Sequence, residues 1–389
     1  MKKNKNSKIN KKNASSRKKP LKLKKGLRNK KETNVKTRKI IKKEKNKKLE
    51  EKKILIIKPK KNLIISPIRE HNWEAWQTFN PGVILLNNRV HFLYRAIGFD
   101  GISRFGYASS PDGFFIDERL NYPVYEHPLI SKKLNYYSFA SGGSFSGAED
   151  PRLTRVMDED TIYMTYTACD NGLGVGLTSI KVGDFLEKKW NWEKPVLISP
   201  PNEIHKNWVI FPEKINNKYA ILHSLSPKIL INYRDSLKFN ENEYISSYYN
   251  GEIKEDNSWE SRIRGIGAPP LKTKYGWLVF YHGIDKFDFS KYKVGAMLLD
   301  LNNPEKILTK LKEPILEPDE YFQETGFKPG IVYASGAVVK DEKILIYYGA
   351  ADSYVCVAYA NFEEFLENLI KNIKPKLKQK KLKKIINKN

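Results

Sequence analysis

The sequence repeats one strand pattern five times from residue 80 onward. Each copy has a start marked by Pro or Gly, a short strand, a polar turn, a strand that ends near an aromatic or His residue, and a further strand. The residues at this aromatic position, which lie 72, 57, 58 and 67 residues apart, are Tyr94, Tyr166, His223, Tyr281 and Tyr348. Recurrence of one supersecondary unit is typical of repeat architectures. We therefore expect an array of similar β units.

The spacing of the copies suits one four-stranded blade plus its loops, and short strands with turn signals dominate each copy. Radial closure of such blades leaves only short, protected sheet edges. The sequence therefore predicts an all-β, five-bladed β-propeller as the catalytic domain over residues 54–370. The strand around Leu63–Ile65 is expected to complete the last blade, and Glu363–Ile370 to form a short helix. A two-sheet sandwich is the alternative, although its strands need not repeat as units.

Positive charge is concentrated in the two ends of the chain. Residues 1–53 contain 25 Lys or Arg against four Glu, and residues 371–389 contain nine Lys and no acid. Because the whole chain carries +26, the segment between these tails is mildly acidic. The N-terminal tail lacks aromatic residues and cannot bury enough apolar surface to offset its ordering entropy.

We expect both lysine-rich tails to be disordered. They are either solvated low-complexity extensions or attachments to RNA, ribosomes or anionic surfaces, because clustered cations bind polyanions. A nucleic-acid enzyme carries its positive groove within the folded part. The mildly acidic middle segment disfavours that class of enzyme.

The sequence also indicates the compartment. A secretory signal needs an apolar stretch of seven or more residues after a short basic region, and Ile54–Ile57 is too short. No span approaches transmembrane length. Cys169 and Cys356 are too few for a disulfide scaffold, and neither Cys nor His shows zinc-ligand spacing. We expect a cytoplasmic enzyme without metal or organic cofactor, and the oligomeric state stays open, a homo-oligomer included.

A propeller would bring distant polar residues together. The first strand of each blade lines the central channel, and convergent polar groups at such a funnel form the default ligand site. The residues that this geometry is expected to gather at one mouth are Asn80, Asp150, Lys206, Asn207, His223, His282 and Asp352.

Asp150 is the strongest candidate for chemistry. Glycosidic cleavage needs a carboxylic acid that protonates the leaving oxygen. Pro151 is expected to bias the backbone of Asp150 to extended geometry, and the like charge of Glu149 helps to keep a proton on the pair. Arg152 is expected to hold one carboxylate or a substrate oxygen. An Asp that merely ends a turn after Ser141–Gly147 is the alternative.

Eight short runs carry a resemblance to a known family. In order they are Phe79–Gly82, Tyr94–Ala96, Ser103–Ala108, Glu149–Arg152, Phe211–Lys214, Gly267–Pro270, Tyr281–Gly283 and Tyr347–Asp352. On these runs the chain resembles glycoside hydrolase family 130, the five-bladed propeller family of β-mannoside phosphorylases and related mannosidases. Each run is weak alone, but their number and order over roughly residues 70–367 make the resemblance specific.

The resemblance implies inverting phosphorolysis. Asp150 would be the lone general acid, and inorganic phosphate would attack the anomeric carbon of an oligosaccharide or small glycoside to give mannose 1-phosphate. The residues implied to bind the mannosyl unit are Asn80, Arg95, Arg104 and Asp352, with Glu149 and Arg152 beside the acid. The alternatives are a blade-stabilising ion pair for Arg95 and a turn cap for Asp352.

Phosphate attack also requires cationic and hydrogen-bonding groups opposite the acid. The candidates are Lys206, Asn207, His223, Tyr281 and His282, although the two histidines are equally compatible with packed positions. Phosphorylases of the family usually have His-Arg where this chain has His223-Ser224. The missing Arg removes a bidentate phosphate ligand, for which Lys228 is a candidate replacement.

Two other functions stay open. A hydrolase, either a mannosidase or a furanosidase-like enzyme, needs a second carboxylate opposite Asp150, for which Glu213 and Glu324 are candidates. A noncatalytic carbohydrate- or RNA-binding propeller is the third hypothesis. Trp73 and Trp76 are placed either to stack on sugar or to close the core, and the core is favoured. Linkage and acceptor sugar stay undetermined.

Overall fold

Strands dominate the described part of the chain, and most run antiparallel to their neighbours. The computed structural model describes residues 54–129, 135, 139, 141–248, 253–255, 258–371 and 375–379. These residues belong to one compact unit, Lys52–Asn389. The predicted all-β class is confirmed.

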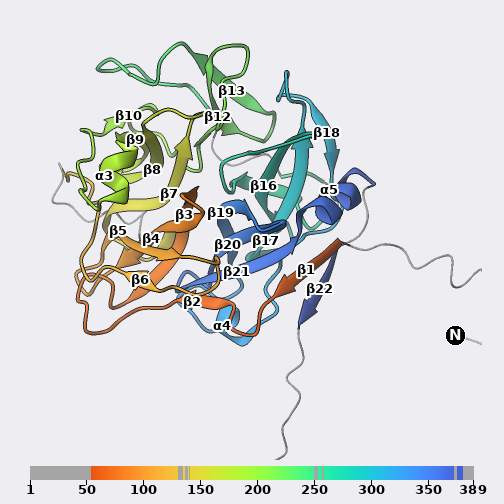
Figure 1. The fold of residues 1–389 in the computed structure, drawn as a ribbon, viewed down its shortest axis with the longest axis horizontal. Helices are drawn as coiled ribbons and strands as arrows, with labels where there is room; N and C mark the ends of the chain where they lie inside the picture. Colours follow the sequence, from red (N-terminus) through yellow and green to blue (C-terminus); the bar gives the residue numbers. More distant parts are fainter. Residues whose placement is uncertain are drawn as a thin grey trace, which may run out of the picture. The chain divides into compact units, whose positions relative to one another are not determined.

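Five sets of three antiparallel strands follow one another along the chain (Figure 1). The first set is β3 (Gln77–Leu86), β4 (Arg89–Ile97) and β5 (Ile102–Ser110), and the second is β7 (Ser146–Arg155), β8 (Ile162–Asp170) and β9 (Gly172–Ile180). The third is β11 (Val209–Ile210), β12 (Tyr219–Ser224) and β13 (Leu230–Arg234). The fourth is β14 (Arg262–Ile266), β16 (Gly276–Asp285) and β17 (Asp288–Leu299). The fifth is β19 (Val332–Lys340), β20 (Lys343–Ala350) and β21 (Tyr354–Asn361).

Short elements extend these sets. The added strands are β6 (Glu118–Arg119), β10 (Val196–Leu197), β15 (Leu271–Thr273) and β18 (Ile307–Lys310), and the helices are α3 (Val182–Leu186), α4 (Tyr321–Glu324) and α5 (Phe362–Ile370). From the N-terminal side, β1 (Ile54–Lys58) and β2 (Leu63–Ile65) pair with β21. The predictions of a strand at Leu63–Ile65 in the last set and of a short helix that ends at Ile370 are confirmed.

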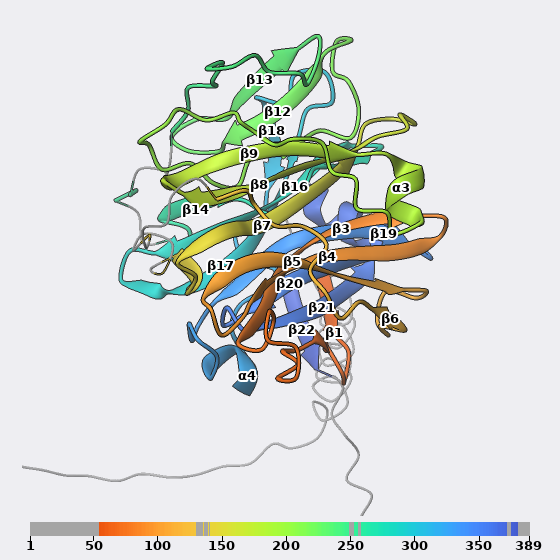
Figure 2. The same ribbon diagram turned by 90° about the vertical axis from the view of Figure 1, so that its left-hand side faces the viewer.

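Hydrophobic side chains pack between the sets rather than in one central mass. Five buried clusters each join two consecutive sets, and one of them joins the fifth set to the first. In that cluster Phe92 and Tyr94 from β4 pack with Leu345 and Tyr347 from β20. β3, the first strand of the first set, contacts both β7 and β19, and the views in Figures 1 and 2 agree on this arrangement. The starts of three sets therefore lie side by side.

The repeated aromatic position has a packing role. In three sets a buried tyrosine on the second strand stands opposite a glycine on the third, and the pairs are Tyr94 with Gly106, Tyr166 with Gly176 and Tyr281 with Gly295. A Cβ added to any of these glycines would lie 2.3 or 2.4 Å from a tyrosine ring carbon. Glycine is therefore required for the ring to lie flat against the neighbouring strand.

The third and fifth sets depart from this arrangement. Tyr348 stands opposite Cys356, and the ladder between β12 and β13 shifts its register around His223. Cys169 and Cys356 are both buried, and neither is part of a disulfide. Within the described ranges, no helix is long and apolar enough to cross a membrane.

The lysine-rich tails lie largely beyond this description. The predicted disorder of residues 1–53, and the attachment of the tails to RNA or anionic surfaces, concern residues outside the described ranges. Pro375–Gln379 of the C-terminal tail differs from the prediction, because it forms β22, which pairs in parallel with β1. An edge strand such as β1 offers unpaired backbone groups to an extended segment, and here a segment with two lysines pairs with it. The prediction of disorder is therefore wrong for this segment.

Candidate active site

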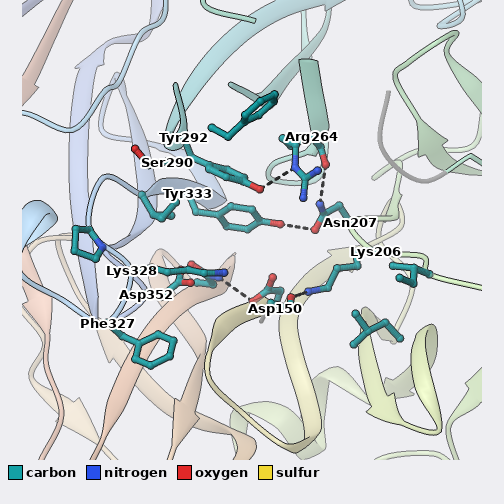
Figure 3. A pocket seen from close by; sticks show the side chains of 17 residues that line it. Asp150, Lys206, Asn207, Arg264, Ser290, Tyr292, Phe327, Lys328, Tyr333 and Asp352 are labelled. Carbon is teal, nitrogen blue, oxygen red and sulfur yellow. Dashed lines mark hydrogen bonds between the residues drawn. The ribbon is translucent and has the colours of Figure 1, made fainter. Parts of the chain in front are cut away.

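A cavity of about 600 Å³ opens beside the starts of the strand sets (Figure 3). Its polar walls contain two aspartates and three cationic side chains, and the lining residues are Asn80, Ser141, Asp150, Lys206, Asn207, Arg264, Ser290, Tyr292, Lys328, Tyr333 and Asp352. The apolar part of the lining consists of Leu173, Ile204, Phe289, Phe327, Pro329 and Ile331. Of the residues predicted to share a site, Asn80, Asp150, Lys206, Asn207 and Asp352 meet here.

A bulge aims Asp150 into this cavity. The β7–β8 ladder shifts register between Glu149 and Arg152, and Asp150 has φ +51°. Bulges re-aim side chains, and Asp and Asn tolerate left-handed backbone better than most residues. The prediction that Pro151 makes Asp150 extended is wrong. The bulge imposes a conformation that the following proline disfavours, which is strain of a kind found at functional sites.

One oxygen of the Asp150 carboxyl accepts two hydrogen bonds. The Asn80 side-chain amide donates to Oδ1 at 2.9 Å, and an Arg95 guanidinium nitrogen donates to the same oxygen at 3.3 Å. Asp150 is only 6% exposed, and that small exposed surface faces the cavity. The carboxyl group is thus held in one orientation toward the site.

Arg95 lies behind Asp150 in a buried ion-pair network. Its guanidinium donates to Glu149 Oε1 at 2.9 Å, and Lys206 Nζ donates to Glu149 Oε2 at 2.8 Å. Burial opposes the charge on Arg95, but the carboxylates of Glu149 and Asp150 raise its pKa. Arg95 and Glu149 are fully buried and do not line the cavity. Their contacts match the ion-pair alternative, with Lys206 as the member that reaches the site.

Asp352 forms a second acidic position on the cavity wall. Its φ is +49° and its side chain is buried, and burial raises its pKa to about 6 against the opposing effects of Lys328 and Arg95. Burial in turn lowers the pKa of Lys328, and Asp352 opposes that shift. Lys328 belongs to a loop, and its own backbone N–H donates to the Ala351 carbonyl at 2.9 Å. This loop lies outside the strand pattern, so sequence reasoning missed Lys328.

The wall seen above Asp150 in Figure 3 is a chain of polar contacts. The Tyr333 hydroxyl donates to Asn207 Oδ1, and Arg264 Nε donates to the Tyr292 hydroxyl at 2.8 Å. The Asn207 amide donates to the Arg264 carbonyl at 3.4 Å. Sequence reasoning missed Arg264, Tyr292 and Tyr333. Arg264 and Tyr333 precede the predicted starts of the fourth and fifth blades, and that position in the sequence is the signal that could have found them.

Tyr281 and His282 do not reach the cavity lining. The Tyr281 hydroxyl donates to Glu260, while its ring packs on Gly295. His282 Nε2 donates to the Ala334 carbonyl at 2.8 Å, and its ring stacks on Tyr333 with centroids 3.8 Å apart. Burial lowers the pKa of His282 to about 3, so it is neutral. The structure therefore places His282 behind Tyr333 rather than at the cavity surface.

His223 lines a second, smaller cavity of about 20 Å³ that Lys206, Ser224 and Arg264 also line. His223 Nδ1 lies 2.8 Å from Ser247 Oγ, and burial lowers its pKa to about 4. Arg264 therefore lies beside Ser224, the position at which the resemblance leads one to expect an Arg. Lys228 is exposed and lines neither cavity.

The two other predicted arginines contact protein groups. Arg152 Nε donates to the Gly267 carbonyl at 2.8 Å, and another of its nitrogens donates to the Asp150 carbonyl at 3.0 Å. Arg152 thereby ties the acid-bearing strand to the fourth set. Arg104 donates to Asp100 at 2.7 Å and to Glu126 at 2.8 Å. Neither arginine lines the cavity.

The remaining candidates are two tryptophans, one in the core and one near the cavity, and two glutamates that do not line the cavity. Trp73 stacks near Tyr94 and donates to the Asn121 carbonyl, which fits the core interpretation. Trp76 is 39% exposed and meets the cavity residue Phe327 edge to face at 5.3 Å. The two carboxylates considered as hydrolytic bases, Glu213 and Glu324, are not lining residues. No group of three or more His, Cys, Asp or Glu suited to a metal ion occurs among the residues that the structure describes.

Comparison with known proteins identifies the family. A family profile described as beta-1,4-mannooligosaccharide phosphorylase matches residues 40–371. The chain is 35% identical over 313 residues to the 1,2-beta-oligomannan phosphorylase of Thermoanaerobacter sp. (strain X514), covering 77% of this chain and 95% of the relative. It is 33% identical over 314 residues to the Beta-1,2-mannobiose phosphorylase of the same strain, with the same coverage.

A solved structure agrees with these matches. The Beta-1,2-Mannobiose phosphorylase from Listeria innocua, in complex with beta-1,2-mannobiose, superposes with a TM-score of 0.63 at 25% identity, covering 81% of this chain and 99% of that one. The class is therefore that of all-β carbohydrate-active proteins. Within it, the chain belongs to glycoside hydrolase family 130.

Proposed function

We propose that this chain is a β-mannoside phosphorylase that transfers a terminal mannosyl unit to inorganic phosphate with inversion. The observation that carries the proposal is that one cavity contains the buried acid Asp150 together with Lys206, Arg264 and Lys328. A phosphate dianion beside a carboxyl group needs such charge-assisted hydrogen bonds. The two sequence relatives compared above are both named phosphorylases of β-mannosides.

Asp150 is the general acid in this proposal. Its Oδ1 accepts hydrogen bonds from Asn80 and Arg95, so the proton is carried by Oδ2. As phosphate oxygen bonds to the anomeric carbon, the glycosidic C–O bond breaks and its electron pair goes to the leaving oxygen. That oxygen takes the proton from Asp150, directly or through a sugar hydroxyl. The products are mannose 1-phosphate and an acceptor one unit shorter.

Asn80 and Asp352 are proposed to bind the mannosyl unit. Both line the cavity next to Asp150, and both are nearly fully buried. Buried polar groups that converge on a ligand fix its orientation. We assign a β-1,2-linked oligomannoside as substrate, because the two relatives compared are named for β-1,2 activity, whereas the family profile is named for β-1,4 activity.

Arg264 is proposed to bind phosphate together with Lys206 and Asn207. Its guanidinium offers the planar donor fork that suits phosphate, and it lies beside Ser224, where the usual arginine is missing. In this assignment, an arginine from the start of the fourth set takes over the role of one from the third. Arg264→Ala is therefore expected to raise the KM for phosphate far more than the KM for the mannoside.

We also propose that the five strand sets are the blades of a propeller over residues 54–370. The support is that each hydrophobic cluster joins consecutive sets and that one joins the last set to the first. Strands from both ends of this segment share one sheet, as β1 and β2 pair with β21. Closure of this kind protects sheet edges.

The test is a product analysis with β-1,2- and β-1,4-mannobiose in the presence and absence of phosphate. The expected result is mannose 1-phosphate and mannose in equal amounts, only with phosphate, and faster from the β-1,2 isomer. Free mannose released equally without phosphate would identify a hydrolase instead. No product from any β-mannoside would favour a noncatalytic binding protein.

A further inference from the structure

The hairpin between β16 and β17 places an exposed aromatic ring on the rim of the active-site cavity. Phe289, the second residue of β17, lines the cavity and is 50% exposed, whereas Asp150 at its base is 6% exposed. Phe287 lies in the turn of the same hairpin, is 75% exposed and does not line the cavity. The two phenylalanines therefore differ in their relation to the site.

The hairpin is anchored without a ligand. At its turn, the Lys286 backbone N–H donates to Ser261 Oγ at 2.6 Å, and the Lys286 ammonium donates to the Glu255 carbonyl at 2.7 Å. Nearer the cavity, the Tyr292 N–H donates to the Gly330 carbonyl at 3.0 Å. Phe289 lies between these two anchors. A backbone segment held in place before binding loses little conformational freedom when a ligand packs on its side chain.

The depth of the cavity determines which part of the substrate lies at its base and which part lies at its rim. In the proposed function the mannosyl unit that reacts lies beside the buried Asp150, so the rest of the sugar chain must extend toward the exposed rim. Aromatic rings provide large apolar faces for such contacts, and the CH-bearing face of a pyranose is the matching surface. Phe289 is the more exposed of the two phenylalanines that line the cavity, the other being Phe327.

We propose that Phe289 is a chain-length determinant that packs on a sugar unit beyond the acceptor unit next to the scissile bond. The substrates are then β-mannosides of three or more units rather than the disaccharide alone. This inference rests on the proposed phosphorolysis, because only that reaction defines which end of the sugar lies at Asp150. The hydroxyl of Ser290, the next residue on the rim, donates to Asp288, so its oxygen can accept a hydrogen bond from the same unit.

The test compares kcat/KM for phosphorolysis of β-1,2-mannobiose, mannotriose and mannotetraose. Phe289→Ala is expected to lower the ratio of tetraose to biose activity about tenfold, which corresponds to ~1.4 kcal/mol. Phe289→Trp is expected to keep the ratio. Phe287→Ala is the matched control from the same hairpin, and it is expected to leave both the activities and the ratio unchanged.

A ratio that is the same in wild type and Phe289→Ala would overturn the inference, as would an equal fall in Phe287→Ala. Because the ratio is taken within one protein, partial unfolding of a variant cancels. Gel filtration separates one more outcome: loss of an oligomer with equal loss of activity on all lengths would make Phe289 a subunit contact. If wild type phosphorolyses no mannoside of any length, the proposed function itself fails.

Discussion

The first strands of the first two sets, β3 and β7, share one backbone device but present different chemistry. In each, the ladder with the next strand shifts register, and the residue before a proline adopts left-handed backbone, with φ +44° at Asn80 and φ +51° at Asp150. One strand thus presents an amide, which stays a neutral donor, and the other a carboxyl group, which can exchange a proton. The repeat fixes the position, and one side chain decides the role.

The strongest way to break this comparison is to give both strands the same residue. Asn80→Asp would put a carboxyl group where an amide now donates to Asp150 Oδ1 at 2.9 Å. Two carboxyl groups at that distance share one proton, and the pKa of one is strongly raised. We expect kcat/KM to fall about 100-fold and the pH profile of the remaining activity to move to higher pH.

Asn87→Asp is the control for that variant. Asn87 also has left-handed backbone, with φ +48°, but it is exposed in the turn after β3. Its substitution is expected to change neither kcat/KM nor the pH profile. An Asn80→Asp enzyme with wild-type activity and an unshifted profile would show that the amide of Asn80 does not govern the acid.

A smaller effect on activity is expected from a substitution at Gly349, which packs against the Asn80 side chain. A Cβ on Gly349 of β20 would lie 1.9 Å from Asn80 Oδ1, so Gly349→Ala must displace that side chain. We expect about a tenfold fall in kcat/KM and a loss of stability of about 1–3 kcal/mol from overpacking. Kinetics and thermal unfolding measure the two effects. Gly183→Ala, with no heavy atom within 4 Å of the new Cβ, is the control, and equal behaviour of both variants would contradict the account.

Sequence reasoning succeeded where the repeat itself carries the site. Asn80, Asp150 and Asn207 lie at or just before the first strands of three sets, and together with Asp352, in the turn between β20 and β21, they line one cavity as expected. Sequence reasoning was wrong for a residue that has a packing role within the repeat and does not line the cavity. Tyr281 occupies the tyrosine position that packs on a glycine of the next strand, so its side chain is directed into the core between sets.

The missed residues lie where strand periodicity gives no signal. Lys328 and Phe327 come from a loop, and a charged or aromatic loop residue is indistinguishable in sequence from an ordinary solvated one. Arg264 belongs to β14, whose bulge between Ile263 and Gly265 alters the alternation that would predict its side. Local sequence patterns therefore predict the strand ends that carry the acid better than the loop and bulge residues that line the rest of the cavity.

The last effect is on stability alone and concerns Asp352, another cavity residue with left-handed backbone. Its folded pKa of about 6 lies above the usual value, so the folded protein holds this proton more tightly than the unfolded chain. That stabilisation is complete below about pH 4 and is lost as the pH rises to about 6. We expect wild type to lose about 2 kcal/mol more unfolding free energy over this range than Asp352→Asn. Parallel curves from urea unfolding of both proteins would contradict the raised pKa.

The central claim is that Asp150 protonates the leaving oxygen, and a leaving-group comparison in Asp150→Asn tests it most directly. An aryl β-mannoside with an acidic phenol needs no proton to depart, whereas β-1,2-mannobiose does. With phosphate present, we predict that the substitution slows mannobiose phosphorolysis about 10³-fold and aryl mannoside phosphorolysis only a few-fold. Equal losses on both substrates, in a variant that unfolds at the wild-type temperature, would contradict the assignment of Asp150 as the acid.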